Sequence, residues 1–382
     1  MRFEDLVVVD LATLAAAPQV ATFFGDLGAR VVKVEHPRGD PLRSLLDRAG
    51  APLQWKIVNR NKECVALDPA SAGDRALLER LLARADLLVA NMTAQRLARH
   101  GLDARSLRAR HPRLVAVNLT TWGTTGPWAD RAGSGTLAEA ASGLAWLTGE
   151  PGGPPGLSPV GLGDHLGVMQ GIVAALVGLL ERDATGADGA SDRAEVRACH
   201  DVAMLDPLLA LASSRIAAAA RDGADPPRVG NRFPTVAPRN AYPTADGRWV
   251  ALTAGTDELA RRTLEVVGRG DLVADPRFAD GASRVRHADE LDAIVGGWIA
   301  ARSCDEVVAA FAAARVSLAA IDPPSAVPRN PQVVARASLV EVDDPALGRV
   351  TLAAPPCGGT IRWLGRSIGA DDAAIRAWLS EE

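Results

Sequence analysis

One aspartate stands where a nucleophilic carboxylate would be most useful. Asp164 follows the Gly/Pro-rich stretch Pro151–Gly163 and precedes a long apolar helix predicted over Leu166–Arg182. Unpaired N–H groups and the positive end of the helix dipole would keep the carboxylate ionised there and would stabilise a developing oxyanion. Those are the requirements for covalent catalysis by a carboxylate. Taken alone, however, this window favours a simpler interpretation, in which Asp164 is an N-cap residue and nothing more.

The cysteines and histidines give no sign of a metal centre. The four cysteines and six histidines are scattered in unrelated settings, without a C-x-x-C pair or metal-ligand spacing. We therefore expect no bound metal, no disulfide framework, and reduced thiols as in a cytosolic enzyme. His165 is of interest only through its neighbour Asp164, and a histidine in such a place more often simply packs.

The elements that must position Asp164 begin with alternating strands and helices over the first 130 residues. Nearly all-apolar strands separated by helices predict a parallel sheet covered on both faces, and hence a Rossmann-like α/β domain. The predicted strands are Leu6–Asp10, Arg30–Glu35, Cys64–Leu67, Asp86–Ala90 and Leu114–Thr120, and the predicted helices are Pro18–Leu27, Gly73–Arg84 and Ala104–Arg110. After the first strand the chain has Leu11–Pro18 instead of G-x-G-x-x-G, which disfavours a nicotinamide dehydrogenase.

The pattern changes from about Asp206 onward. Two strand-like runs flank Pro243–Gly247, which ends in the hairpin signal Asp-Gly, and three amphipathic helices follow. The tail from Pro331 carries a second hairpin-like pair around Asp343–Gly348. We therefore predict a large Rossmann-like domain over residues 1–205, completed by residues 331–382, and a smaller α+β domain over residues 206–330.

Composition limits the classes of protein to which this chain can belong. Its 382 residues, 48% hydrophobic and 23% charged, describe a folded globular protein. A net charge of −4 gives no electrostatic footprint for nucleic acid or an anionic membrane. The N-terminus lacks the layout of a signal peptide, and no stretch is expected to reach the length of a membrane span. We therefore expect a cytoplasmic protein that binds neither nucleic acid nor membrane.

The motifs, taken in order over nearly the whole chain, resemble those of CoA-transferase family III, the CaiB/BaiF family. Each motif alone is weak, but their order and spacing together are specific. They are Ala17-Pro18, Leu27-Gly-Ala29, Val31-Val-Lys-Val-Glu-His-Pro-Arg-Gly-Asp-Pro-Leu-Arg43, Asn59-Arg-Asn-Lys62, Asn118–Arg131, Gly230-Asn-Arg232, Tyr242–Gly247 and Asp275-Pro-Arg-Phe278. Asp164 falls on the catalytic aspartate of the family, which reverses the preference for a plain N-cap.

This resemblance implies a CoA-transferase that works through Asp164. The substrates would be an acyl-CoA donor and a carboxylic acid acceptor, with no tightly bound cofactor, and the intermediates an aspartyl anhydride and an aspartyl-CoA thioester. The family also implies an interlocked homodimer. The connections Arg182–Arg193 and Pro323–Pro331 are the candidates for its crossovers.

The same resemblance supplies candidate contacts to CoA. Basic residues on loops at the carboxyl ends of parallel strands suit its phosphates, and a glycine-rich turn would either cradle a phosphate or merely turn the chain. The candidates are Arg43, Lys62, Arg99, Gly123, Gly126 and Arg131. For each basic residue, a solvated surface charge is an equally plausible interpretation.

Two departures from the family pattern bear on the reaction. In the α-methylacyl-CoA racemase branch, a histidine and a glutamate transfer protons alongside the aspartate, and our alignment puts Ser134 and Thr256 at those places. Neither can deprotonate a carbon next to a thioester, so a racemase or isomerase is the weaker hypothesis. A non-catalytic acyl-CoA-binding relative is the third hypothesis, although it would have lost Asp164. The sequence does not identify the donor or the acceptor acid.

Overall fold

The computed structural model describes residues 2–47, 50–185 and 199–381, and it divides the chain into two compact units. The large unit comprises residues 2–145, 157–222 and 337–381 of the described chain, and the small unit residues 146–156 and 223–336. The expected crossover connection Arg182–Arg193 falls mostly outside the described residues.

The large unit is built on a six-stranded sheet with the order β3-β2-β1-β4-β5-β6, in which every neighbouring pair is parallel. This confirms the predicted α/β class. The strands are β1 Val7–Asp10, β2 Arg30–Glu35, β3 Lys62–Ala66, β4 Leu87–Ala90, β5 Val115–Thr120 and β6 Cys199–Ala203. β1 to β5 lie within two residues of the predicted runs, whereas β6 was not predicted.

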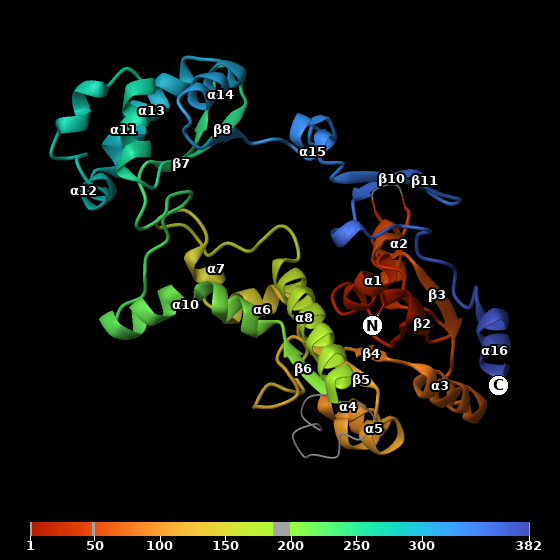
Figure 1. Cartoon of the computed structure of the whole chain (residues 1–382). Helices are drawn as coiled ribbons and strands as arrows, with labels where there is room; N and C mark the ends of the chain where they lie inside the picture. The colour runs from red at the N-terminus through yellow and green to blue at the C-terminus, as the bar shows by residue number, and fades with distance from the viewer. Residues whose placement is uncertain (1, 48–49, 186–198, 382) are drawn as a thin grey trace. The chain divides into compact units, whose positions relative to one another are not determined.

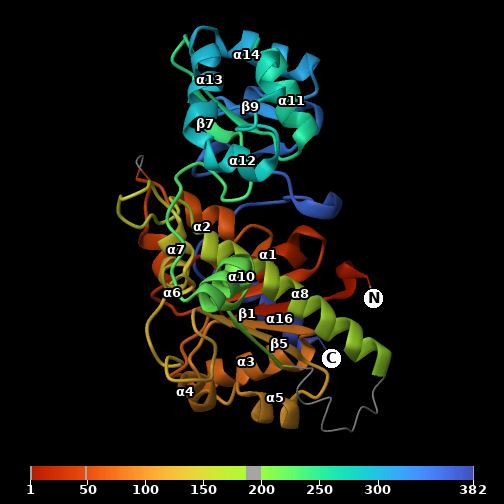
Figure 2. The ribbon, with the colours of Figure 1, turned by 90° about the vertical axis from the view of Figure 1, so that its left-hand side faces the viewer.

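Helices cover both faces of this sheet, as Figure 2 shows. One face packs against α1 and α8, and the other against α3, α5 and α16. Because both faces are buried, the central strands carry apolar side chains at almost every position. The helices of the large unit are α1 Pro18–Asp26, α2 Leu53–Val58, α3 Ala72–Arg84, α4 Ala94–Arg99, α5 Ala104–Arg110, α6 Gly135–Ala141, α7 Leu144–Leu147 (which reaches into the small unit), α8 Leu162–Thr185, α10 Leu205–Asp222 and α16 Asp372–Ser380.

Helix α8 is unusually long and apolar. By length and composition alone, Leu162–Ala184 could cross a membrane, so the expectation that no stretch reaches that length was wrong. Within the large unit, however, α8 contacts β5, β6, α1, α6 and α10, as the core helix of an α/β domain does.

The C-terminal segment packs at the edge of the sheet, where α16 lies beside β3 and α3 (Figure 1). There the backbone N–H groups of Cys64 and Ala66 donate to the carboxylates of Asp371 and Asp372, at 2.8 and 2.9 Å. The C-terminal segment therefore covers the outer edge of β3.

The small unit has its own hydrophobic core, with an antiparallel sheet ordered β7-β8-β9. The hairpin predicted around Pro243–Gly247 is present as β7 and β8. The strands and helices of the small unit are β7 Arg239–Pro243, β8 Trp249–Thr253, β9 Leu318–Ala320, α11 Asp257–Val266, α12 Gly281–Arg286, α13 Ala288–Ala300, α14 Cys304–Ala313 and α15 Pro331–Ala335. In the large unit, β10 Leu339–Asp344 and β11 Gly348–Ala353 form a separate hairpin.

The unit boundaries differ from the predicted ones at residues 205/206 and 330/331. α10 packs against α8 and α6, which keeps residues 205–222 with the large unit. Residues 146–156 belong to the small unit, where Arg228 donates to the carbonyls of Trp146 and Gly153. Long-range packing of this kind leaves no local mark in the sequence.

Candidate functional site

Asp164 lies in the first turn of α8, at its third residue. The alternative of a plain N-cap does not fit, because the position before the helix belongs to Gly161, whose carbonyl accepts the N–H of His165 at 2.9 Å. The carboxylate of Asp164 instead accepts the backbone N–H of Gly135 through Oδ1, at 3.2 Å. Gly135 is the first residue of α6, so two helix starts meet at this carboxylate.

Three glycines form a close backbone cage around Asp164. A Cβ placed on Gly161 would lie 2.6 Å from Oδ2, and one on Gly135 would lie 2.8 Å from Oδ1 and 2.4 Å from the backbone nitrogen of Asp164. A Cβ on Gly163 would lie 2.5 Å from the carbonyl oxygen of Gly135. None of the three has a positive φ, so it is space rather than backbone conformation that requires glycine here.

Burial raises the pKa of the Asp164 carboxyl above its ordinary value. The hydrogen bond from Gly135 and the charge of His165 oppose this change, whereas the charge of Glu139 adds to it. No salt bridge joins Asp164 to a cation in the described chain. A half-buried carboxylate without a cation is poorly solvated when ionised, which makes it a stronger base and a better nucleophile than an exposed aspartate.

The side chain of His165, next to Asp164, is exposed. Its Nδ1 lies 2.9 Å from the carbonyl oxygen of Gly161. This contact holds the histidine on its own helix start.

A cavity of about 580 Å³ opens in the large unit at the carboxyl ends of its strands. Its volume suits a small-molecule ligand. Its walls come from the segments after β1, β2, β3 and β4, which is where parallel sheets bind ligands. The basic side chains that line it are His36, Arg38, Arg75, Arg96, Arg99 and His100.

Of the predicted CoA contacts, only Arg99 lines this cavity. It lies at the last position of α4 and is exposed. The other basic lining residues were missed. The rule that ligands bind beyond the carboxyl ends of parallel strands would have pointed to His36 and Arg38, which directly follow β2.

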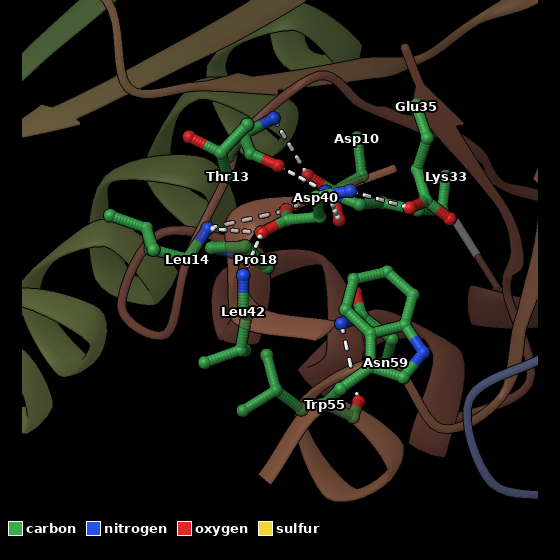
Figure 3. A network of polar contacts seen from close by, with 12 residues as sticks. Asp10, Thr13, Leu14, Pro18, Lys33, Glu35, Asp40, Leu42, Trp55 and Asn59 are labelled. Carbon is green, nitrogen blue, oxygen red and sulfur yellow. Dashed lines mark hydrogen bonds and ion pairs between the residues drawn. The ribbon is translucent and has the colours of Figure 1, made fainter. Parts of the chain in front are cut away.

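A buried network of charges supports the cavity wall (Figure 3). Lys33 lies between Asp10 and Asp40, at 3.7 and 3.5 Å, and also donates to the carbonyl of Ala12. Asp40 accepts the backbone N–H of Leu14, which has a φ of 66°, and the N–H of Leu42. The network thus fixes the loop after β1 against the loop after β2.

Lys62 belongs to this network and is fully buried. Its ammonium donates to Asp10 at 2.8 Å, to the carbonyl of Pro18 at 2.7 Å and to Asn59 Oδ1 at 3.1 Å, which uses all three of its N–H groups. Burial lowers the pKa of Lys62 to about 8, against the opposing charge of Asp10. This geometry argues against the predicted contact between Lys62 and CoA.

Arg43 also acts within the protein. Its guanidinium donates to both oxygens of Glu35, at 2.7 and 2.8 Å, and to the carbonyl of Arg366, and it stacks on Trp55 at 3.7 Å. Glu35 lines the cavity whereas Arg43 does not. Arg43 therefore supports the wall from behind, in place of the direct contact that was predicted.

The remaining candidates lie on the loop after β5. Arg131 is exposed and lies over the ring of Trp128, at 4.8 Å. Gly123 and Gly126 have φ of 80° and 82°, so they are required by the turn. Both donors of Thr124 are bonded to Asp201 Oδ2, which favours the structural interpretation of this turn over a phosphate cradle.

The two positions aligned with the racemase acid/base pair stand directly before helices. Ser134 is exposed and precedes α6 without a side-chain cap hydrogen bond, whereas Thr256 caps α11 by accepting the N–H of Leu259. Neither hydroxyl is basic enough to take a proton from a carbon next to a thioester.

Comparison with known proteins agrees with these observations. The family model described as CoA-transferase family III matches residues 3–360. The chain is 31% identical to a succinyl-CoA–D-citramalate CoA-transferase of Chloroflexus aurantiacus, over 97% of this chain and 92% of that protein. It is 33% identical to an acetyl-CoA:oxalate CoA-transferase of Acetobacter aceti, over 76% and 73% of the two chains.

A solved structure has the same fold. A CaiB/BaiF family protein from Brucella suis superimposes with a TM-score of 0.82 and 29% identity, over 99% of each chain. With the family model matching nearly the whole length, the chain belongs to CoA-transferase family III and is a transferase.

Proposed function

We propose that this protein transfers CoA from an acyl-CoA donor to a carboxylic acid acceptor, with Asp164 as the nucleophile. The observation that carries the proposal is the cage around Asp164: a carboxylate without a cation, held by one backbone N–H and flanked by glycines. Such a carboxylate is reactive, and the glycines let the backbone approach it closely, which larger residues would prevent.

The reaction proceeds by four acyl exchanges. The Asp164 carboxylate attacks the carbonyl carbon of the donor thioester, and the C–S bond breaks to give a mixed anhydride and CoA thiolate. The thiolate then attacks the aspartyl carbonyl of the anhydride, which releases the donor acid as a carboxylate and leaves an aspartyl-CoA thioester. The acceptor carboxylate repeats both steps in reverse, so the new acyl-CoA forms and Asp164 is regenerated.

The surroundings of Asp164 support each attack. The Gly135 N–H, now bonded to Oδ1, stabilises negative charge on that oxygen when the aspartyl carbonyl becomes tetrahedral. The start of α8 adds a positive dipole end. Recapture of the thiolate is favoured because it is held beside an activated carbonyl.

The 580 Å³ cavity is the place for the nucleotide part of CoA. Its exposed arginines offer charge-assisted hydrogen bonds to phosphates, and they are Arg38, Arg75, Arg96 and Arg99. Among the carboxylates in the same wall, Glu35 and Asp40 form salt bridges with Arg43 and Lys33. The phosphates therefore meet the exposed arginines rather than these two carboxylates.

Replacement of the nucleophile tests the proposal. Asp164→Ala should abolish transfer of CoA between acids, measured by mass detection of new thioesters, while circular dichroism shows an intact fold. Wild-type protein mixed with a good donor and no acceptor should yield, after hydroxylamine or borohydride trapping, a modified peptide containing Asp164. Retention of more than a few per cent of the turnover by Asp164→Ala would exclude Asp164 as nucleophile. Exchange of the α-hydrogen in deuterated solvent without CoA transfer would support the racemase instead.

We also propose that the protein is a homodimer. An apolar stripe at helical spacing runs along α8 and is 42% to 62% exposed in the single chain, formed by Met169, Val173, Val177 and Leu180. A stripe of this kind marks a contact with another surface. Sedimentation at sub-micromolar concentration should show a dimer, and a stable, active monomer would contradict it.

A further inference from the structure

Glu139 is a buried carboxylate next to the nucleophile. It lies on α6 and is 3% exposed. Its Oε2 accepts the backbone N–H of Ser158 at 3.2 Å, and its Oε1 accepts the N–H of Gly163 at 3.3 Å. Within the described chain no lysine, arginine or histidine forms an ion pair with it. Glu139 is therefore satisfied by backbone N–H groups alone.

The two bonds span the segment that leads into Asp164. Ser158 lies six residues before Asp164, and Gly163 immediately before it. Gly163 is also the second residue of α8, so its N–H has no partner within the helix. Glu139 thus does from a neighbouring helix what an N-cap side chain does, and it fixes the point at which α8 starts.

The charge of Glu139 acts on Asp164 as well. The charged groups that act on the Asp164 carboxylate are Glu139 from α6 and His165 from α8 itself. The negative charge of Glu139 adds to the effect of burial and raises the pKa of Asp164, whereas His165 lowers it. A less stable carboxylate is a more basic one, and so a better nucleophile.

We propose that Glu139 is a positioning residue for the nucleophile: it ties the 158–163 segment with two hydrogen bonds and keeps a second negative charge beside Asp164. The inference rests on the proposed function, in which Asp164 attacks the thioester. Nothing in the sequence indicated it, because Glu139 stands in an ordinary Ala-rich helix.

The first test measures the coupling between the two carboxylates without using activity. Folding raises the pKa of the Asp164 carboxyl, so its ionised form destabilises the folded protein. This destabilisation is complete above the folded-state pKa and disappears below the unfolded-state pKa of about 4. Asp164→Asn should therefore raise Tm at pH 8 and leave it unchanged well below pH 4. In the Glu139→Gln background the rise at pH 8 should be smaller, since the neighbouring charge is gone.

The second test follows the acid limb of the pH profile of kcat/KM. In Glu139→Gln this limb should move to lower pH, because the like charge has been removed, and the plateau should fall. Asp344→Asn is the control for loss of a buried carboxylate away from Asp164, since Asp344 accepts the backbone N–H groups of Ala346 and Leu347 and also pairs with Lys56. Its limb should not move. His165→Gln must retain the limb, because His165 is the other titratable group beside Asp164.

The outcomes separate this inference from the proposed function. An equal Tm rise from Asp164→Asn in both backgrounds, an unmoved acid limb in Glu139→Gln, or a limb that disappears in His165→Gln would each overturn the role of Glu139. If Asp164→Ala were active, the proposed function would fail, and the Tm comparison would still decide whether the two carboxylates interact.

Discussion

Two regions of the large unit treat buried charge in opposite ways. Under the cavity wall, Asp10, Lys33, Asp40 and Lys62 are all buried, and each carboxylate has a cation within 4 Å. Near the start of α8, by contrast, no salt bridge of the described residues joins Asp164 or Glu139 to a cation. The paired charges hold two loops in place, whereas under the proposed function the carboxylates without a salt bridge serve the reaction.

The largest effect should come from breaking the paired network. Lys62→Met leaves Asp10 buried with only Lys33 as a cation, so the free energy of unfolding should fall by about 3–5 kcal/mol. Urea denaturation at one fixed protein concentration measures this. Arg131→Met, which removes an exposed cation, should change stability by less than about 0.5 kcal/mol. A Lys62→Met protein as stable as the wild type would show that the network is not a structural device.

The next largest effect should come from filling the cage. Gly161→Ala puts a Cβ 2.6 Å from Asp164 Oδ2 and must displace the carboxylate, so kcat should fall about 100-fold, or roughly 2.7 kcal/mol. Stability should change far less than in Lys62→Met. Gly297→Ala is the control, because it lies in a helix with no atom within 4 Å of the added Cβ. A fully active Gly161→Ala enzyme would contradict the geometry assigned to the nucleophile.

The smallest effect should come from the cavity. Arg99→Ala removes one exposed phosphate partner, so KM for acyl-CoA should rise about tenfold, or roughly 1.4 kcal/mol, with little change in kcat. At high ionic strength the difference in KM between Arg99→Ala and the wild type should be smaller, since salt screens exposed charges. Arg105→Ala, an exposed arginine of α5 outside the cavity, should leave KM unchanged. Equal KM values for the two variants would remove Arg99 from the binding site.

Local patterns were enough to predict the frame of the large unit. Apolar runs predicted β1 to β5, because strands buried on both faces have few polar positions. β6 was missed because it is an edge strand with exposed and half-buried positions, Cys199-His200-Asp201. The three-residue strand β9 is too short to leave a pattern.

The predictions about single residues depended on what lies close by in space. Asp164 was singled out by its place between a glycine-rich stretch and a helix and then by the family resemblance, whereas its contact with Gly135, 29 residues away in the chain, left no local sign. Lys62 looked like a surface cation, since its partner Asp10 is 52 residues away in the chain. Glu139 gave no local sign of its role for the same reason, since its hydrogen-bond partners lie 19 and 24 residues further along the chain.

The cover that the C-terminal segment places on β3 has a consequence for the order of synthesis. Until residues 337–381 leave the ribosome, the N–H groups of Cys64 and Ala66 lack the carboxylates of Asp371 and Asp372. The nascent large unit then presents an open sheet edge, which is a template for pairing with other chains. We expect a chain that ends at residue 336 to aggregate under conditions in which the full chain stays dispersed, and light scattering would reveal if it does not. A segment made after the sheet is thus the one that covers its edge strand β3.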